Sequence, residues 1–276
     1  MRLADSHIHL FPNGYRHDGL PAIFGSGELA AYEDLCSAHG IELALAIGYE
    51  ADGIDPQNNA YIRRLSATRN WLRTVAYIEA AAAPAANIVE TLLEEGHCGI
   101  ALYVNDALTA QNMLRWPKRI WEVLASRLAI VSINARPEAI ALLPPIIEAA
   151  AGVPFLFSHL GLPGRLPAEI DDHALRSRLA PLLNLARLSN VYVKISGLYA
   201  ISDPPFAHAH PPTVRCIHEI LAAFGCQRCL WGSDFSPALE FLSFSQTIDW
   251  DGAEQLGSQD RDLVMGSNLA RLLGSA

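Results

Sequence analysis

The chain has 276 residues, a hydrophobic fraction of 51% and a formal net charge of −9 at pH 7. This length suits one α/β barrel of roughly 250 residues, and the hydrophobic content is sufficient for a large core. The negative charge argues against a nucleic-acid partner, and the lack of any apolar run of roughly 18 residues argues against a membrane span. Because the chain opens with a strand pattern rather than a secretion signal, we expect a cytoplasmic enzyme.

Short apolar runs alternate with longer amphipathic segments along the whole chain. Most runs are continuously apolar, as in parallel strands that are covered on both faces. We expect eight strands, at residues 3–9, 42–48, 73–78, 99–104, 128–134, 153–159, 191–196 and 229–233.

Helical patterns fill the gaps between these strands. We expect helices at 26–39, from 55 onward, and at 84–95, 113–126, 138–150, 173–188, 213–224 and 260–273. Alternating strands and helices form right-handed βαβ units and a parallel sheet. The sequence therefore predicts a single-domain (β/α)8 TIM barrel over residues 1–276, with an open doubly wound sheet as the alternative. The longest irregular stretches follow expected strands one, six, seven and eight, on the C-terminal side where barrel enzymes carry their chemistry.

His7 and His9 are two residues apart in the first expected strand, so both side chains point to one face, the barrel interior near its mouth. Two buried imidazoles there are costly unless they form hydrogen bonds or bind a ligand. His159 and Asp234 come at the ends of the sixth and eighth expected strands. Three imidazoles and one carboxylate around one mouth suit metal binding or general acid–base work on a carbonyl substrate.

Five motifs in order along the chain resemble those of the amidohydrolase superfamily. They are DSHIH at 5–9, SHLG at 158–161, VYVKISG at 191–197, WGSD at 231–234 and MGSNLARL at 265–272. The resemblance is closest to the amidohydrolase 2 branch of predicted metal-dependent TIM-barrel hydrolases. It implies that His7 and His9 match the family's His-x-His motif, and that His159 and Asp234 match its sixth-strand His and eighth-strand Asp. This branch includes lactonases that act on sugar lactones, muconolactones and pyrone dicarboxylates, and related branches include decarboxylases.

The resemblance leaves metal dependence open. Metal-dependent members usually add a His after strand five or a carboxylated Lys on strand four, whereas this chain has Asn134 at the first place and no Lys at the second. One divalent ion, with zinc preferred, could bind His7, His9 and Asp234, and either Glu50 or Glu79 could complete the site. Hydrolysis without any metal is an equal alternative.

We expect hydrolysis of a small cyclic ester. Asp234 would take a proton from water while His7, His9 and His159 polarise the carbonyl group or hold the ion. The alternatives are a metal-dependent decarboxylase of a small unsaturated or aromatic acid, and a non-catalytic barrel that binds a small molecule.

The substrate is expected to be a carboxylated lactone, because Arg136 could clamp a carboxylate. Further candidates for substrate binding are Tyr49, Tyr103, Asn134 and Tyr199. For Lys194 we expect a barrel-interior lysine paired with a carboxylate. His208 and His210 are expected in a solvated loop, although a cap over the site is an alternative, and a homodimer is a further open expectation.

Overall fold

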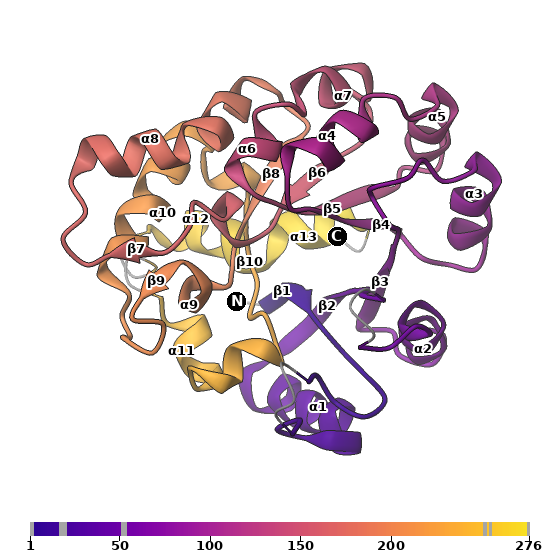
Figure 1. Ribbon diagram of the computed structural model, residues 1–276. Helices are drawn as coiled ribbons and strands as arrows, with labels where there is room; N and C mark the ends of the chain where they lie inside the picture. Colours follow the sequence, from indigo (N-terminus) through magenta and orange to yellow (C-terminus); the bar gives the residue numbers. More distant parts are fainter. Residues whose placement is uncertain (1–2, 17–20, 51–53, 251–252, 254–255, 275–276) are drawn as a thin grey trace.

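The computed structural model describes residues 3–16, 21–50, 54–250, 253 and 256–274. Eight parallel strands form the main sheet in the order β1-β2-β3-β4-β5-β6-β8-β10 (Figure 1). Their bounds are β1 Leu3–Ile8, β2 Ile41–Ile47, β3 Leu72–Tyr77, β4 Gly99–Val104, β5 Ile130–Ala135, β6 Phe155–Phe157, β8 Val191–Ile195 and β10 Cys229–Trp231. All eight strands expected from the apolar runs are present.

The first and last strands meet, so the sheet is nearly closed into a barrel. Just beyond β10, the backbone N–H of Asp234 donates to the carbonyl oxygen of His7 at 2.9 Å. One residue further along both segments, Ile8 and Phe235 form a parallel bridge. The predicted TIM barrel is therefore confirmed, and the open doubly wound sheet is excluded.

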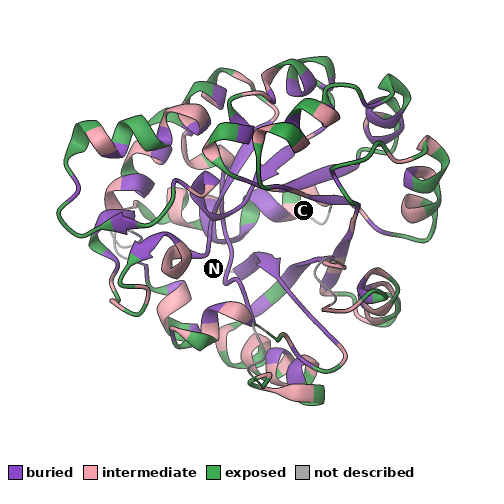
Figure 2. Cartoon of the chain, in the orientation of Figure 1, coloured by how far each residue is buried: buried purple, intermediate pink, exposed green. Residues whose placement is uncertain are grey.

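Helices surround the sheet, with exposed residues on their outer sides and buried residues along the strands (Figure 2). The larger helices are α1 Glu28–His39, α2 Asn58–Ser66, α3 Ala86–Glu94, α4 Ala107–Met113, α5 Lys118–Ser126, α7 Pro144–Ala149, α8 Asp172–Leu183 and α10 Pro211–Phe224. Shorter ones are α6 Pro137–Ile140, α9 Leu198–Ile201, α11 Phe244–Ile248, α12 Ser258–Asp262 and α13 Asn268–Leu272.

Proline accounts for two differences from the expected helices. The expected helix at 113–126 is wrong at its start, because Met113 ends α4 and Pro117 precedes α5. The expected helix at 138–150 is interrupted between α6 and α7, and Pro144 opens the second part. Proline lacks an N–H and clashes with the preceding turn, so it ends one helix and suits the first turn of the next.

The inside of the barrel changes from apolar to polar along the strands. A compact apolar cluster contains alternate residues of single strands, such as Leu43, Leu45 and Ile47 of β2. Alternate residues of a strand share a face, so this cluster fills the interior. Two-residue steps toward the C-terminal ends then reach polar residues: Ser132 after Ile130, Ser158 after Leu156, and Lys194 and Ser196 after Tyr192. The strands therefore deliver polar side chains to one end of the barrel.

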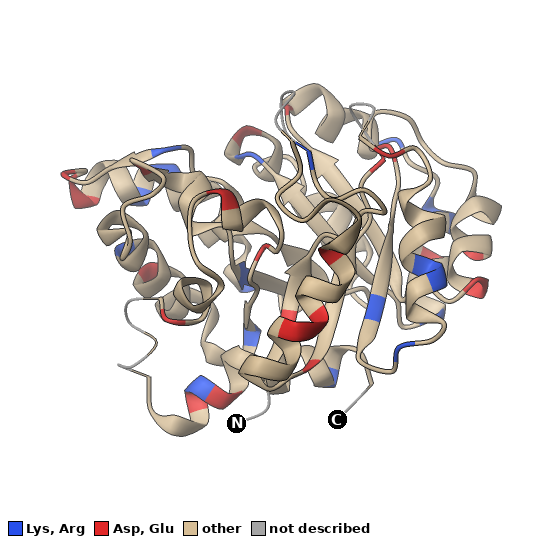
Figure 3. Ribbon diagram, turned by 90° about the horizontal axis from the view of Figure 1, so that it is seen from below, with Lys and Arg blue, Asp and Glu red and all other residues tan. Residues whose placement is uncertain are grey.

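Two further features lie outside the main sheet. The loops after β6 and β8 pair through the short parallel strands β7 (Leu166–Pro167) and β9 (Ser202–Asp203), which the sequence did not predict. Acidic and basic residues lie interspersed over the outer helices (Figure 3). Among the helices of the described residues, none combines the length and the apolar character that a bilayer crossing needs.

Candidate active site

The two histidines at the end of β1 lie together at the mouth of the barrel. Their Nε2 atoms are 3.2 Å apart, and both residues are buried. Nδ1 of His9 lies 3.1 Å from the carbonyl oxygen of Ile47. Burial and the nearby charge of Lys194 hold the pKa of His7 well below its ordinary value, and burial lowers the pKa of His9 to about 4. Both imidazoles are therefore neutral at pH 7.

Asp234, after β10, brings its carboxylate to this pair. Oδ1 lies 3.6 Å from Nε2 of His7 and 3.9 Å from Nε2 of His9. Oδ2 accepts a hydrogen bond from the hydroxyl of Tyr199 at 2.8 Å. Burial raises the pKa of Asp234 to about 6, and the neighbouring imidazole of His9 and hydroxyl of Tyr199 limit the rise. One carboxylate oxygen thus has a donor, and the other faces the imidazoles.

His159 completes the predicted set of three imidazoles and one carboxylate. It follows β6 with a backbone φ of 52°, and its Nδ1 lies 3.1 Å from Oγ of Ser196 and 3.9 Å from Oδ2 of Asp234. Gly197, at φ 59°, passes so close that a Cβ there would lie 2.2 Å from Nδ1 of His159. Burial lowers the pKa of His159 to about 4. The structure therefore brings all four expected residues together.

Lys194 lies directly beneath the histidine pair. Its Nζ donates to Oγ of Ser132 at 2.8 Å and lies 3.3 Å from Nδ1 of His7. The side chain is fully buried, and burial lowers the pKa of Lys194 to about 7, against the attraction of Asp5 and Asp234. Lys194 is thus a barrel-interior lysine as expected, but its hydrogen-bond partners are a hydroxyl and an imidazole rather than a carboxylate.

Asp5 is a site residue that the sequence reasoning missed. Its Oδ1 accepts from the backbone N–H groups of His7 at 3.1 Å and Ser233 at 2.9 Å, and Oδ2 accepts from the hydroxyl of Tyr32 at 3.0 Å. This buried carboxyl group therefore links β1 to the segment after β10 and to α1. A signal was present in the sequence, because Asp5 precedes His7 by two residues and belongs to the same motif.

Three tyrosines gather where β2, β3 and β4 end. The ring centroids of Tyr49 and Tyr103 are 4.6 Å apart, and Tyr77 lies 5.9 Å from each of them. The hydroxyl oxygen of Tyr103 is buried without a hydrogen-bond partner. Burial, followed by the charges of Tyr49 and Asp234, holds the pKa of Tyr103 well above its ordinary value. Tyr49 and Tyr103 were candidates from the sequence, whereas Tyr77 was not predicted.

The remaining predicted residues differ in their exposure. Arg136 is exposed at the N-terminus of α6, where its charge acts on Asp106. Asn134 is half-buried near the end of β5. His208 is exposed and His210 is buried just before α10, with their ring centroids 6.0 Å apart.

Three residues of the cluster carry atoms that can bind a metal ion. His7, His9 and Asp234 each offer one ligand atom, and these atoms lie within 4.8 Å of one another. Two imidazole nitrogens and a carboxylate oxygen are the ligands that zinc takes in catalytic sites. The two extra ligands considered from the sequence are engaged elsewhere, since Glu50 accepts from the backbone of Asn59 and Glu79 accepts from Tyr77. Within the described residues the donor set therefore fits zinc with three protein ligands.

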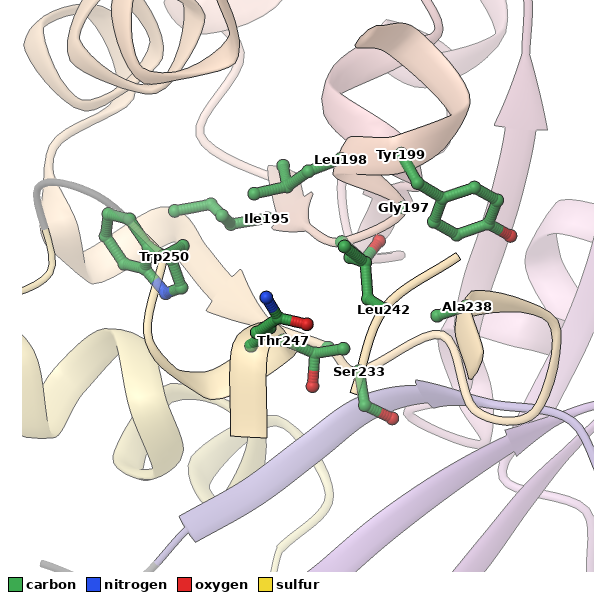
Figure 4. A pocket seen from close by; sticks show the side chains of 12 residues that line it. Ile195, Gly197, Leu198, Tyr199, Ser233, Ala238, Leu242, Thr247 and Trp250 are labelled. Atoms are coloured by element: carbon green, nitrogen blue, oxygen red, sulfur yellow. The ribbon is translucent and has the colours of Figure 1, made fainter. Parts of the chain in front are cut away.

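A pocket adjoins the cluster on the side of Asp234 and His159. Its lining includes Ser196 and Tyr199, which contact His159 and Asp234 respectively. Ile195, Leu198 and Trp250 lie along one part of the wall (Figure 4). The pocket therefore reaches the residues that contact His159 and Asp234, and its lining is largely apolar.

This arrangement of three imidazoles and a carboxylate at the mouth of a barrel matches a known protein family. A family model described as amidohydrolase matches residues 4–275. The chain belongs to the amidohydrolase family. The resemblance inferred from five motifs is thereby confirmed.

Relatives of this amidohydrolase agree with that assignment. An L-fucono-1,5-lactonase from Burkholderia multivorans is 29% identical over 126 residues, which cover 42% of this chain and 41% of that protein. The alignment thus spans less than half the length of the lactonase.

Solved structures show the same fold. An amidohydrolase from Burkholderia multivorans with bound zinc superposes with a TM-score of 0.78 at 19% identity, over 99% of both chains. A probable 2-pyrone-4,6-dicarboxylic acid hydrolase from Acinetobacter baumannii with bound citric acid gives 0.75 at 14% identity, over 99% of this chain and 100% of that chain.

Proposed function

We propose that this amidohydrolase hydrolyses the ester bond of a small lactone, with Asp234 as the base that activates water. The observation that carries the proposal is the position of its Oδ1, which faces two neutral imidazoles while Tyr199 holds the other oxygen. A base beside fixed N–H donors is what the addition of water to a carbonyl group requires. The similarity to a lactonase and to a probable pyrone-dicarboxylate hydrolase supports a lactone as the substrate.

The first step forms a tetrahedral intermediate. Asp234 takes a proton from water as the water oxygen bonds to the carbonyl carbon, and the π electron pair moves onto the carbonyl oxygen. His7 and His159 would donate N–H groups to that oxygen, and His9 would orient His7 through their close Nε2 atoms. A donor already aimed at a developing oxyanion typically contributes about 3 kcal/mol to catalysis.

The second step opens the ring. The electron pair returns to the carbonyl carbon, the bond from that carbon to the ring oxygen breaks, and protonated Asp234 gives its proton to the leaving oxygen. The product is a hydroxy acid, and Asp234 is ionised again. Tyr199 keeps the carboxylate in one orientation through both proton transfers.

A divalent ion would be held by His7, His9 and Asp234, where it would act as a Lewis acid and lower the pKa of a bound water. Ester hydrolysis makes less demand on such activation than amide hydrolysis, because an alkoxide is the better leaving group. The side chains described above therefore supply a complete acid–base route of their own.

For substrate recognition we propose a neutral, hydroxyl-rich ring, as in a sugar lactone. The ring cluster of Tyr49, Tyr77 and Tyr103 offers apolar faces and hydroxyl groups at the C-terminal ends of β2, β3 and β4. The buried Tyr103 hydroxyl in particular gains a partner when a substrate hydroxyl arrives. A carboxylated lactone would need Arg136 to bind its carboxylate. That side chain is exposed, and its charge interacts with Asp106. Tyr199 and Asn134 remain candidates for further substrate contacts.

Decarboxylation of a small acid is the second candidate, and it needs a firm hold on a carboxylate. Tyrosine hydroxyls suit that task less well than a guanidinium group, which binds carboxylates through paired hydrogen bonds. We therefore rank decarboxylation below lactone hydrolysis.

A substrate panel tests the proposal. Purified protein is offered sugar lactones, muconolactones, a pyrone dicarboxylate and unsaturated acids, and the release of protons and of CO2 is followed separately. We expect proton release with sugar lactones and no CO2 from any compound. CO2 release without ring opening would establish the decarboxylase instead. Binding of panel members with turnover of none would favour the non-catalytic barrel.

A further inference from the structure

The two histidines of the pair differ in what faces their outer nitrogens. Nδ1 of His9 lies 3.1 Å from the carbonyl oxygen of Ile47. Nδ1 of His7 lies 3.3 Å from Nζ of Lys194 and 3.2 Å from Oγ of Ser158. A carbonyl oxygen can only accept a hydrogen bond, a lysine ammonium can only donate, and a serine hydroxyl can do either. The surroundings therefore favour opposite tautomers for the two rings.

For His9 the assignment follows from the backbone. Because the oxygen of Ile47 needs a donor, the ring proton of His9 lies on Nδ1. Its Nε2 is then a bare nitrogen with a free electron pair.

For His7 the assignment follows from the lysine. The amine of Lys194 is fully buried and is fixed by a second hydrogen bond, from Nζ to Oγ of Ser132 at 2.8 Å. The ammonium form of Lys194 can only donate to Nδ1, which favours the ring proton of His7 on Nε2.

The contact between the rings agrees with both assignments. The two Nε2 atoms are 3.2 Å apart, a distance that one N–H group and one free electron pair fit as a hydrogen bond. A directed chain results, in which Lys194 donates to His7, His7 donates to His9, and His9 donates to the carbonyl oxygen of Ile47.

This chain of hydrogen bonds affects how the two histidines can bind a metal ion. A metal-binding histidine usually donates its second ring N–H to a carboxylate, a carbonyl oxygen or water. His9 has such a partner in Ile47, whereas His7 has an amine at that place. To bind an ion through Nε2, His7 must move its proton to Nδ1 and turn it toward Ser158, against the neighbouring amine.

We propose that Lys194 is a positioning residue that keeps His7 as an N–H donor and thereby opposes metal binding at the His7–His9–Asp234 cluster. If the proposed lactone hydrolysis holds, this N–H group turns from His9 to the carbonyl oxygen when the substrate binds. The opposition to metal binding stands on the hydrogen-bond chain alone.

Zinc affinity provides the first test. Metal-free wild type and Lys194→Met are titrated with zinc against a chromophoric chelator, since methionine keeps much of the side-chain length but has no donor. We expect zinc to bind Lys194→Met roughly tenfold or more tightly than wild type. Loss of a supporting outer partner weakens metal binding by about this factor, and loss of an opposing donor should act in the reverse direction. The matched control is Lys118→Met, the same change at an exposed surface lysine, which should leave zinc affinity unchanged. Equal or weaker zinc binding by Lys194→Met overturns the proposal.

The ring nitrogens of His7 provide a second test that needs no variant at Lys194. In metal-free wild type labelled with 15N-histidine, the His7 signals are assigned by their loss in His7→Gln. We expect a protonated Nε2 and a bare Nδ1, and the opposite pattern overturns the proposal. Both readouts are independent of turnover, so a failure of the lactonase proposal would leave them unchanged and would be recognised separately.

Discussion

The hydroxyl of Tyr199 donates to Oδ2 of Asp234 at 2.8 Å and leaves Oδ1 as the oxygen that faces His7 and His9. This contact joins α9 to the segment after β10, and the two residues are 35 positions apart in the chain. It anchors one oxygen of the carboxylate and leaves the other toward the two imidazoles. A base held in this way is oriented before the substrate arrives.

Removal of that anchor should slow the chemical step. For Tyr199→Phe we expect kcat on the best lactone to fall by roughly tenfold, because the carboxylate loses the donor that orients it. The control is Tyr192→Phe, which removes a hydroxyl at the opposite end of β8 and should leave kcat within a factor of about two. Steady-state kinetics decide the matter, and equal kcat values for Tyr199→Phe and wild type would remove Tyr199 from the mechanism.

The buried hydroxyl of Tyr103 should lower the free energy of unfolding and contribute to substrate binding. In Tyr103→Phe the unpartnered polar group is gone, so the free energy of unfolding should stay equal or rise by about 1 kcal/mol. The same change should raise KM for a sugar lactone about tenfold. Urea unfolding and kinetics on one protein sample measure both quantities. A loss of stability with unchanged KM would instead give Tyr103 a purely structural role.

Gly197 should be intolerant of any side chain. Its φ is positive and a Cβ would lie 2.2 Å from Nδ1 of His159, so Gly197→Ala must displace that imidazole. A displacement of about 1 Å at a catalytic group can lower kcat/KM about 100-fold. The matched control is Gly257→Ala, where no atom lies within 4 Å of the added Cβ, and it should keep wild-type activity. Comparable activity of the two variants would show that the position of His159 is unimportant.

His97 should make the fold less stable in acid. It is buried with Nδ1 2.9 Å from Oγ1 of Thr74, and burial lowers its pKa from 6.5 to about 4. Between these two values the unfolded chain binds the extra proton, so the contribution of His97 is complete above pH 6.5 and is lost as the pH falls toward 4. By pH 4 the loss amounts to about 3 kcal/mol.

The test compares the pH dependence of unfolding in wild type and His97→Gln, which does not titrate. The free energy of unfolding should fall less steeply from pH 6.5 to 4 in the variant. Parallel curves for the two proteins would mean that His97 has the same pKa folded and unfolded.

The barrel could be predicted from the sequence because its strands are buried on both faces and read as apolar runs. Helix boundaries were less accessible where proline occurs, as at Pro117 and Pro144, since an amphipathic pattern continues across a break in the backbone. The paired loop strands β7 and β9 have two residues each, too few for any periodicity to indicate them.

The core of the site followed from a period of two at His7 and His9 and from strand ends at His159 and Asp234. Contacts between side chains of distant strands could not be predicted from such patterns. Lys194 was expected to pair with a carboxylate, yet its imidazole partner is 187 residues away and depends on the register of barrel closure. The same holds for Asp5, whose link to Ser233 crosses the closing seam. Cytoplasmic location and a homodimer stay predictions.

The central claim, that Asp234 is the base of a lactone hydrolase, is tested most directly by Asp234→Asn. Asparagine has nearly the same shape, can still accept from Tyr199, and cannot take a proton from water at neutral pH. With the best lactone of the panel we expect kcat to fall by about 100-fold or more, while the circular dichroism spectrum stays that of wild type. Lactone turnover at the wild-type rate by folded Asp234→Asn would contradict the account.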